Sequence, residues 1–268
     1  MITRSAIFLV LMYMPLSANA QDTLALHQEI TLPESHFYNV DVFGNYYLTQ
    51  SDQLQKRDSH GKLLYAYSNP ILGPIASVDL LNTMQPLVFF DEVNTLAILD
   101  NRLNESRQLT LNNLGFIDPV MVQLSDQDNV WIYDQQRDKI IRLDLNSQKI
   151  NAQSINLTQL LGGENIPAKL MATYSRVVLV TPQKGALLFD PLGSFQKVID
   201  LPENAPTHIK DQGLYYWHRD TLYHYTFANN FIRRYRLPTN TPQQIKVVQD
   251  KVYLFSAGKA TIYRKVKK

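Results

Sequence analysis

"NVWIYDQQRDKIIRLD", residues 129–144, is the stretch that decides the fold of this 268-residue chain. Four bulky residues in a row are followed by a polar turn, then by Ile-Ile-Arg-Leu and an aspartate. A short bulky run that ends at a turn is typical of a buried strand, and the second run completes a hairpin. If the hairpin recurs along the chain, it defines the whole architecture.

The hairpin pattern does recur. A bulky strand, a polar turn and a second strand appear six times, spaced 37 to 47 residues apart, with starts at Asn45, Pro86, Asn129, Arg176, Gly213 and Lys251. This spacing is the period of four-stranded propeller blades. The sequence therefore predicts an all-β, six-bladed β-propeller.

Each hairpin is preceded by one more strand-like segment. The six segments read "FYNVDVF", "IASVDLL", "PVMVQLS", "AKLMATY", "PTHIKDQ" and "QQIKVVQ". As the first strand of each blade, they are expected to line the central channel of the ring.

The two ends of the chain are expected to meet in one blade. The last repeat stops after three strands, near Arg264, and the first is preceded by "LALHQEITLP", residues 24–33. An N-terminal strand that completes the last blade would close the ring and remove the exposed edge of an open array. Residues 21–268 then form a single propeller domain.

One insertion interrupts the period. "NLTQLLGGENIP", residues 156–167, has an Asn start, a Leu pair and a Gly-Gly stop. These features fit a short helix laid over one mouth of the ring, and they fit equally a plain loop with apolar anchors.

The first twenty residues read as a secretory signal. A basic residue, Arg4, precedes an apolar run of about ten residues, and Ala18-Asn19-Ala20 places small residues before an expected cleavage at Gln21. The apolar run is short of the roughly twenty residues that span a bilayer. We expect a periplasmic or secreted protein that does not span the membrane, and since no cysteine follows the cleavage site, no lipid anchor.

The chain contains no cysteine, which excludes disulfides and thiolate metal sites. No nucleophile elbow and no glycine-rich phosphate loop is present, and the histidines are scattered. We therefore expect no cofactor, and we favour a non-catalytic protein over an enzyme.

The strand–turn–strand pattern ending in "IIRLD" resembles the repeats of NHL-type and TolB-like six-bladed propellers. At the level of pattern, the resemblance covers most of the chain after the signal, although the glycine-rich blade turns of NHL repeats are mostly missing. The whole is also similar to small secreted propellers of Gram-negative bacteria with no assigned role. The resemblance implies a fold and a compartment, and it carries over no catalytic residue.

Two aspartates suggest a metal site. Asp41 and Asp79 occupy equivalent places in the first two channel strands, so two carboxylates could face the axis, where a divalent cation would support a hydrolase or lactonase. The other four blades offer a mixed set at this place: Gln123, Thr173, Lys210 and Val247 or Val248. The alternative is that these are simply polar residues of a wet channel.

An aromatic hairpin, "LYYWHRDTLYHYTF" at residues 214–227, is a second candidate. Strand residues alternate faces, so half of its rings must pack between blades. The others could bind a sugar ring or a protein side chain. The candidate contact residues are Tyr215, Trp217, Tyr223 and His224.

Charge is distributed unevenly along the chain. Residues 209–268 hold twelve Lys or Arg against three Asp, whereas residues 21–208 hold thirteen against twenty-one acidic residues. One sector of the ring is therefore expected to be basic, with Arg233, Arg234 and Arg236 as candidate contacts. Such a field can orient an acidic envelope protein or the phosphates of an envelope lipid, or it can merely keep the ring soluble. No nucleic acid is expected.

The leading hypothesis is a non-catalytic interaction or scaffold module of the cell envelope that binds a protein partner through the propeller rim. Propellers present many loops on a rigid frame, and function lies in such loops. The alternatives are the metal-assisted hydrolase or lactonase and a glycan-binding propeller.

Overall fold

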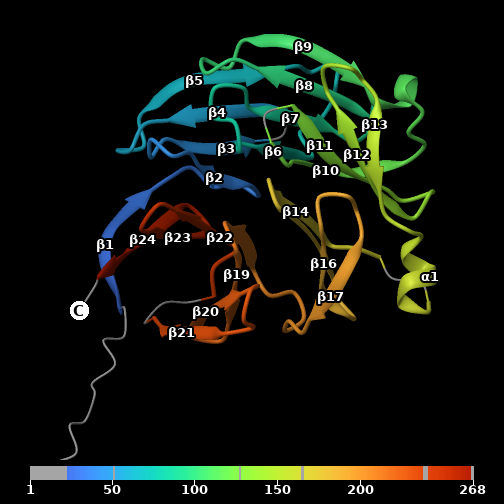
Figure 1. Ribbon diagram of the computed structural model, residues 1–268. Helices are drawn as coiled ribbons and strands as arrows, with labels where there is room; N and C mark the ends of the chain where they lie inside the picture. The colour runs from blue at the N-terminus through green and yellow to red at the C-terminus, as the bar shows by residue number, and fades with distance from the viewer. Residues whose placement is uncertain (1–22, 51, 127, 164–165, 238–240, 267–268) are drawn as a thin grey trace, which may run out of the picture.

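The computed structural model describes residues 23–50, 52–126, 128–163, 166–237 and 241–266, and these form six antiparallel four-stranded sheets arranged as a ring (Figure 1). The predicted six-bladed all-β propeller is thus confirmed. The expected signal peptide, residues 1–20, lies outside the described residues. Within the described ranges, no helix has the length and apolar character to span a membrane.

Blades 1 to 3 follow the chain in order. Blade 1 contains β2 (Tyr38–Val40), β3 (Tyr46–Gln50), β4 (Gln53–Arg57) and β5 (Leu63–Ser68). Blade 2 contains β6 (Ser77–Asp79), β7 (Leu87–Phe90), β8 (Thr95–Leu99) and β9 (Glu105–Thr110), followed by the 3-10 helix η1 (Leu111–Leu114). Blade 3 contains β10 (Pro119–Leu124), β11 (Asn129–Asp134), β12 (Lys139–Asp144) and β13 (Ile150–Gln153).

Blades 4 to 6 complete the ring. Blade 4 contains β14 (Lys169–Thr173), β15 (Arg176–Thr181), β16 (Gly185–Phe189) and β17 (Phe195–Ile199). Blade 5 contains β18 (Thr207–Lys210), β19 (Gly213–His218), β20 (Thr221–Thr226) and β21 (Ile232–Arg236). Blade 6 contains β22 (Gln244–Val248), β23 (Lys251–Ser256), β24 (Lys259–Val266) and, as its outer strand, β1 (Thr23–Thr31).

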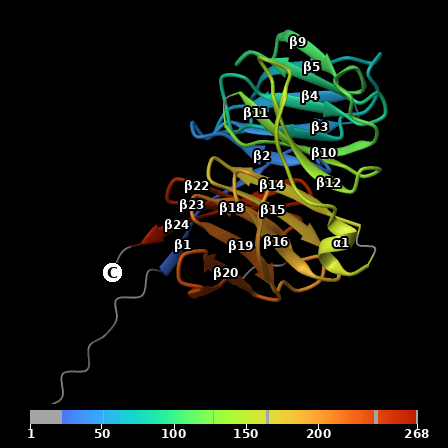
Figure 2. The same cartoon turned by 45° about the vertical axis from the view of Figure 1, so that its right-hand side comes forward.

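The N-terminal strand closes the ring, as expected. β1 pairs antiparallel with β24 from Thr23 opposite Val266 to Thr31 opposite Lys259, and the two strands lie side by side in Figures 1 and 2. The side chain of Ile30 is buried with Tyr38, Tyr253 and Phe255, so it joins blade 6 to blade 1. The first and last strands that the structure describes are therefore held in one sheet, and the outer edge of β24 is covered.

The core consists of six apolar layers, one between each pair of neighbouring blades. The layer between blades 3 and 4, for example, buries Trp131 and Ile140 against Leu179 and Phe189. This explains the unalternating bulky quartets of the sequence, because the second strand of each blade has a neighbouring blade on both faces.

The insertion forms a helix. In α1 (Leu157–Leu161) the Asn156 side chain accepts a hydrogen bond from Gln159 N at 2.9 Å, and Gly162 ends the helix in the left-handed region with φ 71°. The helix does not cover a mouth of the ring. Leu157 packs into the layer between blades 3 and 4, and α1 lies at the periphery of the molecule (Figures 1 and 2).

Candidate functional site

The first strand of every blade has two different sides. On the side toward the preceding blade, residues such as Val78, Leu170, Ile209 and Ile245 are buried in the apolar layers. On the side toward the next blade each first strand also carries a polar residue, which is Asn39 in blade 1, and in blades 2 to 6 the five residues Asp79, Gln123, Lys169, His208 and Lys246. Because the first strands are the innermost, these five side chains lie around the central channel, and we call them the channel cluster.

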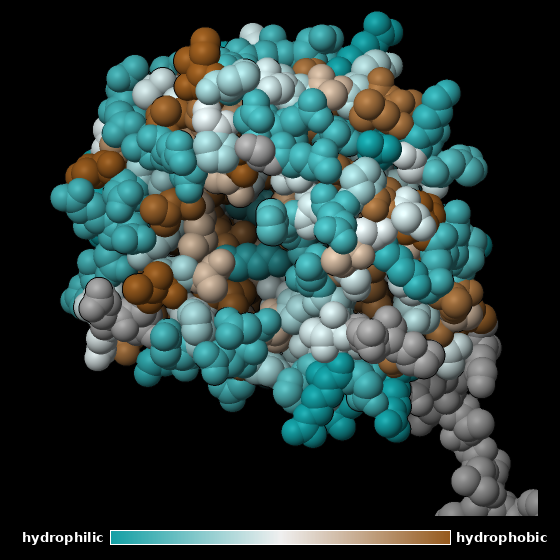
Figure 3. Space-filling model, turned by 180° about the vertical axis from the view of Figure 1, so that it is seen from behind, coloured by the Kyte–Doolittle hydropathy of each residue, from teal (hydrophilic) through white to brown (hydrophobic). Residues whose placement is uncertain are grey.

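The channel cluster interacts across the axis. Asp79 and Lys246 belong to blades 2 and 6, which are not neighbours in the ring, yet the two charges act on each other. Lys169 and Lys246, from blades 4 and 6, likewise repel each other. Figure 3 shows a hollow at the centre of one face, with hydrophilic residues inside it.

Asp79 holds two blades together at the acidic side of the channel. Its carboxylate accepts hydrogen bonds from Leu81 N and Leu124 N, both at 2.7 Å, and from the side-chain amide of Gln123. Burial raises the pKa of Asp79, while these backbone hydrogen bonds and the charge of Lys246 act in the opposite direction.

Two lysines form the basic side of the channel. Lys169 Nζ donates to the carbonyl oxygen of Thr207 at 2.5 Å, and burial lowers its pKa to about 8, with the positive charge of Lys246 as a further cause. Burial also lowers the pKa of Lys246, although Asp79 opposes this. The described residues provide no hydrogen-bond acceptor for Lys246 Nζ, and no carboxylate lies in ion-pair contact with Lys169.

His208 lies between the two lysines in the ring. Burial lowers its pKa well below the ordinary value, and the charges of Lys246 and Lys169 lower it further. A hydrogen bond to the backbone of Val247 acts in the opposite direction but does not outweigh them, so the imidazole is neutral at neutral pH and its single N–H is already used. The channel thus combines two ammonium groups, a neutral imidazole, an amide and one carboxylate.

The two aspartates predicted as a metal pair have separate roles. Asp41 follows β2 and folds back on its own turn, where its Oδ1 accepts hydrogen bonds from Phe43 N at 2.9 Å and Asn45 N at 2.8 Å. Its Oδ2 accepts from the Asn45 side chain at 2.9 Å. Asp79, by contrast, joins blades 2 and 3. In the part of the chain that the structure describes, no group of three or more His, Cys, Asp or Glu side chains is placed to hold a metal ion.

The hydrogen-bond pattern of the Asp41 turn recurs in other turns of the ring. The same two hydrogen bonds, from the backbone N–H groups two and four residues later, are made by Asp58, Asp100 and Asp190. These three residues lie in the turns between the third and fourth strands of blades 1, 2 and 4. The aspartate at the end of "IIRLD", Asp144, accepts from Asn146 N and Ser147 N in the corresponding turn of blade 3. The motif aspartate is therefore structural.

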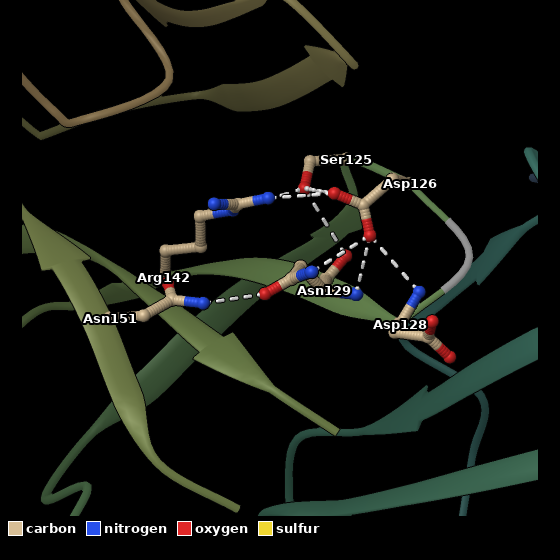
Figure 4. A network of polar contacts seen from close by, with 6 residues as sticks. All are labelled: Ser125, Asp126, Asp128, Asn129, Arg142 and Asn151. Carbon is tan, nitrogen blue, oxygen red and sulfur yellow. Dashed lines mark hydrogen bonds and ion pairs between the residues drawn. The ribbon is translucent and has the colours of Figure 1, made fainter. Parts of the chain in front are cut away.

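The motif arginine is also structural. Arg142 pairs with Asp126 at 2.7 Å, and Asp126 in turn accepts from Asn129 N at 2.8 Å and Asp128 N at 3.0 Å (Figure 4). This network fixes the loop between β10 and β11. A similar pair, Arg264 with Asp250 at 2.6 Å, anchors the corresponding loop of blade 6.

The aromatic hairpin turns most of its large rings inward. Tyr215 and Trp217 are buried against blade 6, and Trp217 Nε1 donates to the carbonyl oxygen of Arg219 at 2.6 Å. Tyr223 and His224 are partly exposed and stack on Tyr216 and Tyr215, with ring centroids 4.8 Å and 4.1 Å apart.

Burial also shifts the titration of this hairpin. It lowers the pKa of His224 to about 4, helped by the charges of Lys265, Arg233 and Lys210. It raises the pKa of Tyr215 to about 12. These shifts are those of a packed layer rather than of an open sugar-binding surface.

The three arginines do not form one patch. Successive residues of β21 point to opposite faces of blade 5, so Arg233 lies opposite His224 whereas Arg234 lies over the ring of Tyr223, 5.7 Å from its centroid. Arg236 pairs with Asp220 at 2.6 Å. The basic residues of 209–268 that the structure describes, up to Lys265, nevertheless occupy adjacent blades, 5 and 6, on one side of the ring.

One face of the ring carries exposed apolar side chains that the sequence analysis did not identify. All blades share one strand order, so the turns between first and second strands, and between third and fourth strands, emerge together on what we call the loop face. Its exposed large apolar residues are Val42, Phe43, Leu81, Met84, Tyr174, Leu192 and Phe231. Tyr174 is 79% exposed and Phe43 71%.

A pocket of about 230 Å³ opens on the loop face between blades 2 and 3. Its lining includes Gln85, Arg107, Asp128 and Asn146. Asp128 and Asn146 are held in place by a hydrogen bond of 2.8 Å between their side chains.

The fold places the chain in the class of six-bladed β-propellers, and three solved structures illustrate the likeness. The chain is similar to virginiamycin B lyase from Staphylococcus aureus (14% identity, 92% of this chain and 100% of that chain, TM-score 0.61). It is similar to the WD40 domain of Pan2 from Neurospora crassa (9% identity, 93% and 97%, TM-score 0.61). It is also similar to BBS1N solved in complex with ARL6DN (8% identity, 91% and 97%, TM-score 0.62).

No family model matches the chain, and no curated protein does. At these identities the structural likeness shows the fold alone, so any function must be argued from the residues of this chain.

Proposed function

We propose that the chain is a non-catalytic interaction module of the cell envelope that binds a protein partner through its loop face. The observation that carries the proposal is the set of exposed apolar side chains there, with Phe43 and Tyr174 as the most exposed rings. Aromatic side chains of this kind are enriched among residues that contribute most to binding at protein interfaces.

The loop face is also rigid enough for selective binding. The Asp41 turn and the Arg142–Asp126 network fix two of its loops, so less conformational entropy is lost on association. The pocket between blades 2 and 3 could receive a single partner side chain, with Arg107 and Asp128 offering opposite charges at its wall.

The basic sector favours an acidic partner. Blades 5 and 6 carry most of the excess positive charge, and charge of this kind chiefly accelerates encounter with an anionic surface. The expected compartment is the periplasm or the cell exterior, and the expected affiliation is with TolB-like or NHL-like propellers, because of the six "hydrophobic–polar turn–hydrophobic" hairpins.

The alternative functions gain no support from the geometry. The oxygens of Asp41 are used by its own turn, which weakens the proposal of a hydrolase built on Asp41 and Asp79. The rings of Tyr215 and Trp217 are buried, which weakens the proposal of a glycan site on that hairpin.

The test uses immobilised protein and a cell-envelope extract. We expect reproducible capture of an acidic protein by the wild type, and roughly tenfold weaker capture by Phe43→Ser and by Tyr174→Ser. Ile71→Ser is the matched control, because Ile71 is 90% exposed on the opposite face. Equal capture by all four proteins, or a loss as large in Ile71→Ser, would contradict the proposal.

A further inference from the structure

The channel cluster contains more positive charge than its neighbours compensate. Asp79 is the one carboxylate of the cluster, and it already accepts three hydrogen bonds, two from backbone N–H groups and one from Gln123. Lys169 contacts a carbonyl oxygen, and Lys246 has no hydrogen-bond acceptor among the described residues. Two ammonium groups therefore face a channel with a single counter-charge on its far side.

Such an arrangement is costly for the fold alone. Removing an ammonium group from bulk water without a close anionic partner destabilises the folded state. Apolar residues would fill the same positions at lower cost, as they do on the other side of each first strand, at Leu170 and Ile245 for example. The presence of lysine at these two positions is therefore better explained by the binding of an anionic ligand than by packing.

From the charges and donors around the axis, we propose that the channel is a binding site for a small divalent oxyanion, held by the ammonium groups of Lys169 and Lys246. The ammonium groups of Lys169 and Lys246 would supply charge-assisted hydrogen bonds to the anion. Asp79 repels the anion and confines it to the side of blades 4 to 6.

The class of ligand follows from the charge and the position of the lysines. The first strands of blades 4, 5 and 6 contact one another directly, β14 with β18 and β18 with β22, so Lys169 and Lys246 lie on the same side of the channel with His208 between them. A phosphate, a sulfate or a short dicarboxylate carries the two negative charges that these two ammonium groups would balance. The site is separate from the exposed apolar residues of the loop face, and its test does not depend on the proposed protein partner.

The test measures anion binding to the purified protein at constant ionic strength. Inorganic phosphate, sulfate and succinate are each titrated at pH 7 against sodium chloride of matched ionic strength, with melting temperature and calorimetry as readouts. We expect at least one of the three to bind and to raise the melting temperature. We expect the affinity to fall at least tenfold in Lys169→Gln and in Lys246→Gln.

Two controls keep the result decisive. Lys62→Gln removes the same charge from an exposed turn and should leave binding unchanged. In the wild type, sulfate binding at pH 8 should take up a fraction of a proton, since an anion raises the pKa of Lys169, which lies near 8 without it.

The proposal is overturned if none of the three anions stabilises the wild type beyond the chloride control. It is also overturned if Lys62→Gln weakens binding as much as the channel variants, or if binding persists in the Lys169→Gln/Lys246→Gln double variant. The wild-type proton uptake stands even if a variant fails to fold, and its absence would count against Lys169 as a ligand.

Discussion

At the scale of single residues, the same side chain type performs different tasks according to its place in the blade. Asp41 and Asp79 look equivalent in the sequence, since each follows a Val at the end of a first strand. Asp41 lies one residue beyond β2 and caps its own turn, whereas Asp79 is the last residue of β6 and binds the next blade. The two strands have equal lengths, and a one-residue difference in where they end relative to the aspartate separates the two roles.

Replacing Asp41 tests its role in the turn. Asp41→Ala leaves Phe43 N and Asn45 N without their acceptor, so we expect a loss of about 1–3 kcal/mol in the free energy of unfolding. Asp41→Asn keeps one oxygen for both N–H groups and should cost less. Urea unfolding measures both variants, and an Asn variant less stable than the Ala variant would rule out this role.

At the scale of elements, most strands were predictable because their signals are local. Each hairpin start found in the sequence lies within one residue of an observed strand start, as at Asn45 and β3, because bulky runs and polar turns report directly on buried strands. The position of α1 at the periphery was not predictable. It depends on a tertiary contact, the packing of Leu157 into the apolar layer between blades 3 and 4. Likewise, the inward direction of Tyr215 and Trp217 depends on register, which a dense aromatic run does not reveal.

The closing strand offers a matched pair of substitutions. Ile30 and Leu26 both lie on β1, but Ile30 is buried between blades 6 and 1 while Leu26 is 59% exposed. We expect Ile30→Ala to lower the free energy of unfolding by about 2–4 kcal/mol, and Leu26→Ala to change it by less than about 0.5 kcal/mol. Chemical denaturation measures the pair. Equal effects would mean that β1 does not complete the core.

At the scale of the whole molecule, the candidate site exists only once the ring is closed. Lys169, His208 and Lys246 are dispersed over 78 positions of the sequence and form no motif. The available signal is a polar residue at alternate positions of each first strand, as in "KLMAT", "THIK" and "QIKVV", but the sequence does not say which side faces the channel. The fold was therefore predictable from the repeat, and the channel cluster was not, because ring geometry creates it.

The central claim is that the channel lysines are kept for binding rather than for folding. The direct test is the melting temperature of Lys169→Met without added anion. The titratable groups that interact with Lys169 are Lys246 on β22 and His208 on β18, and these two interact in turn with Asp79 on β6 and Lys210 on β18. A lysine whose pKa is lowered to about 8 destabilises the folded state below pH 8, and the penalty disappears as the pH rises from 8 toward 10.5.

The account predicts that Lys169→Met melts at or above the wild-type temperature at pH 7, and that any advantage shrinks by pH 9.5. A variant that melts several degrees below the wild type at pH 7 would contradict the claim, because Lys169 would then be a structural residue of the ring.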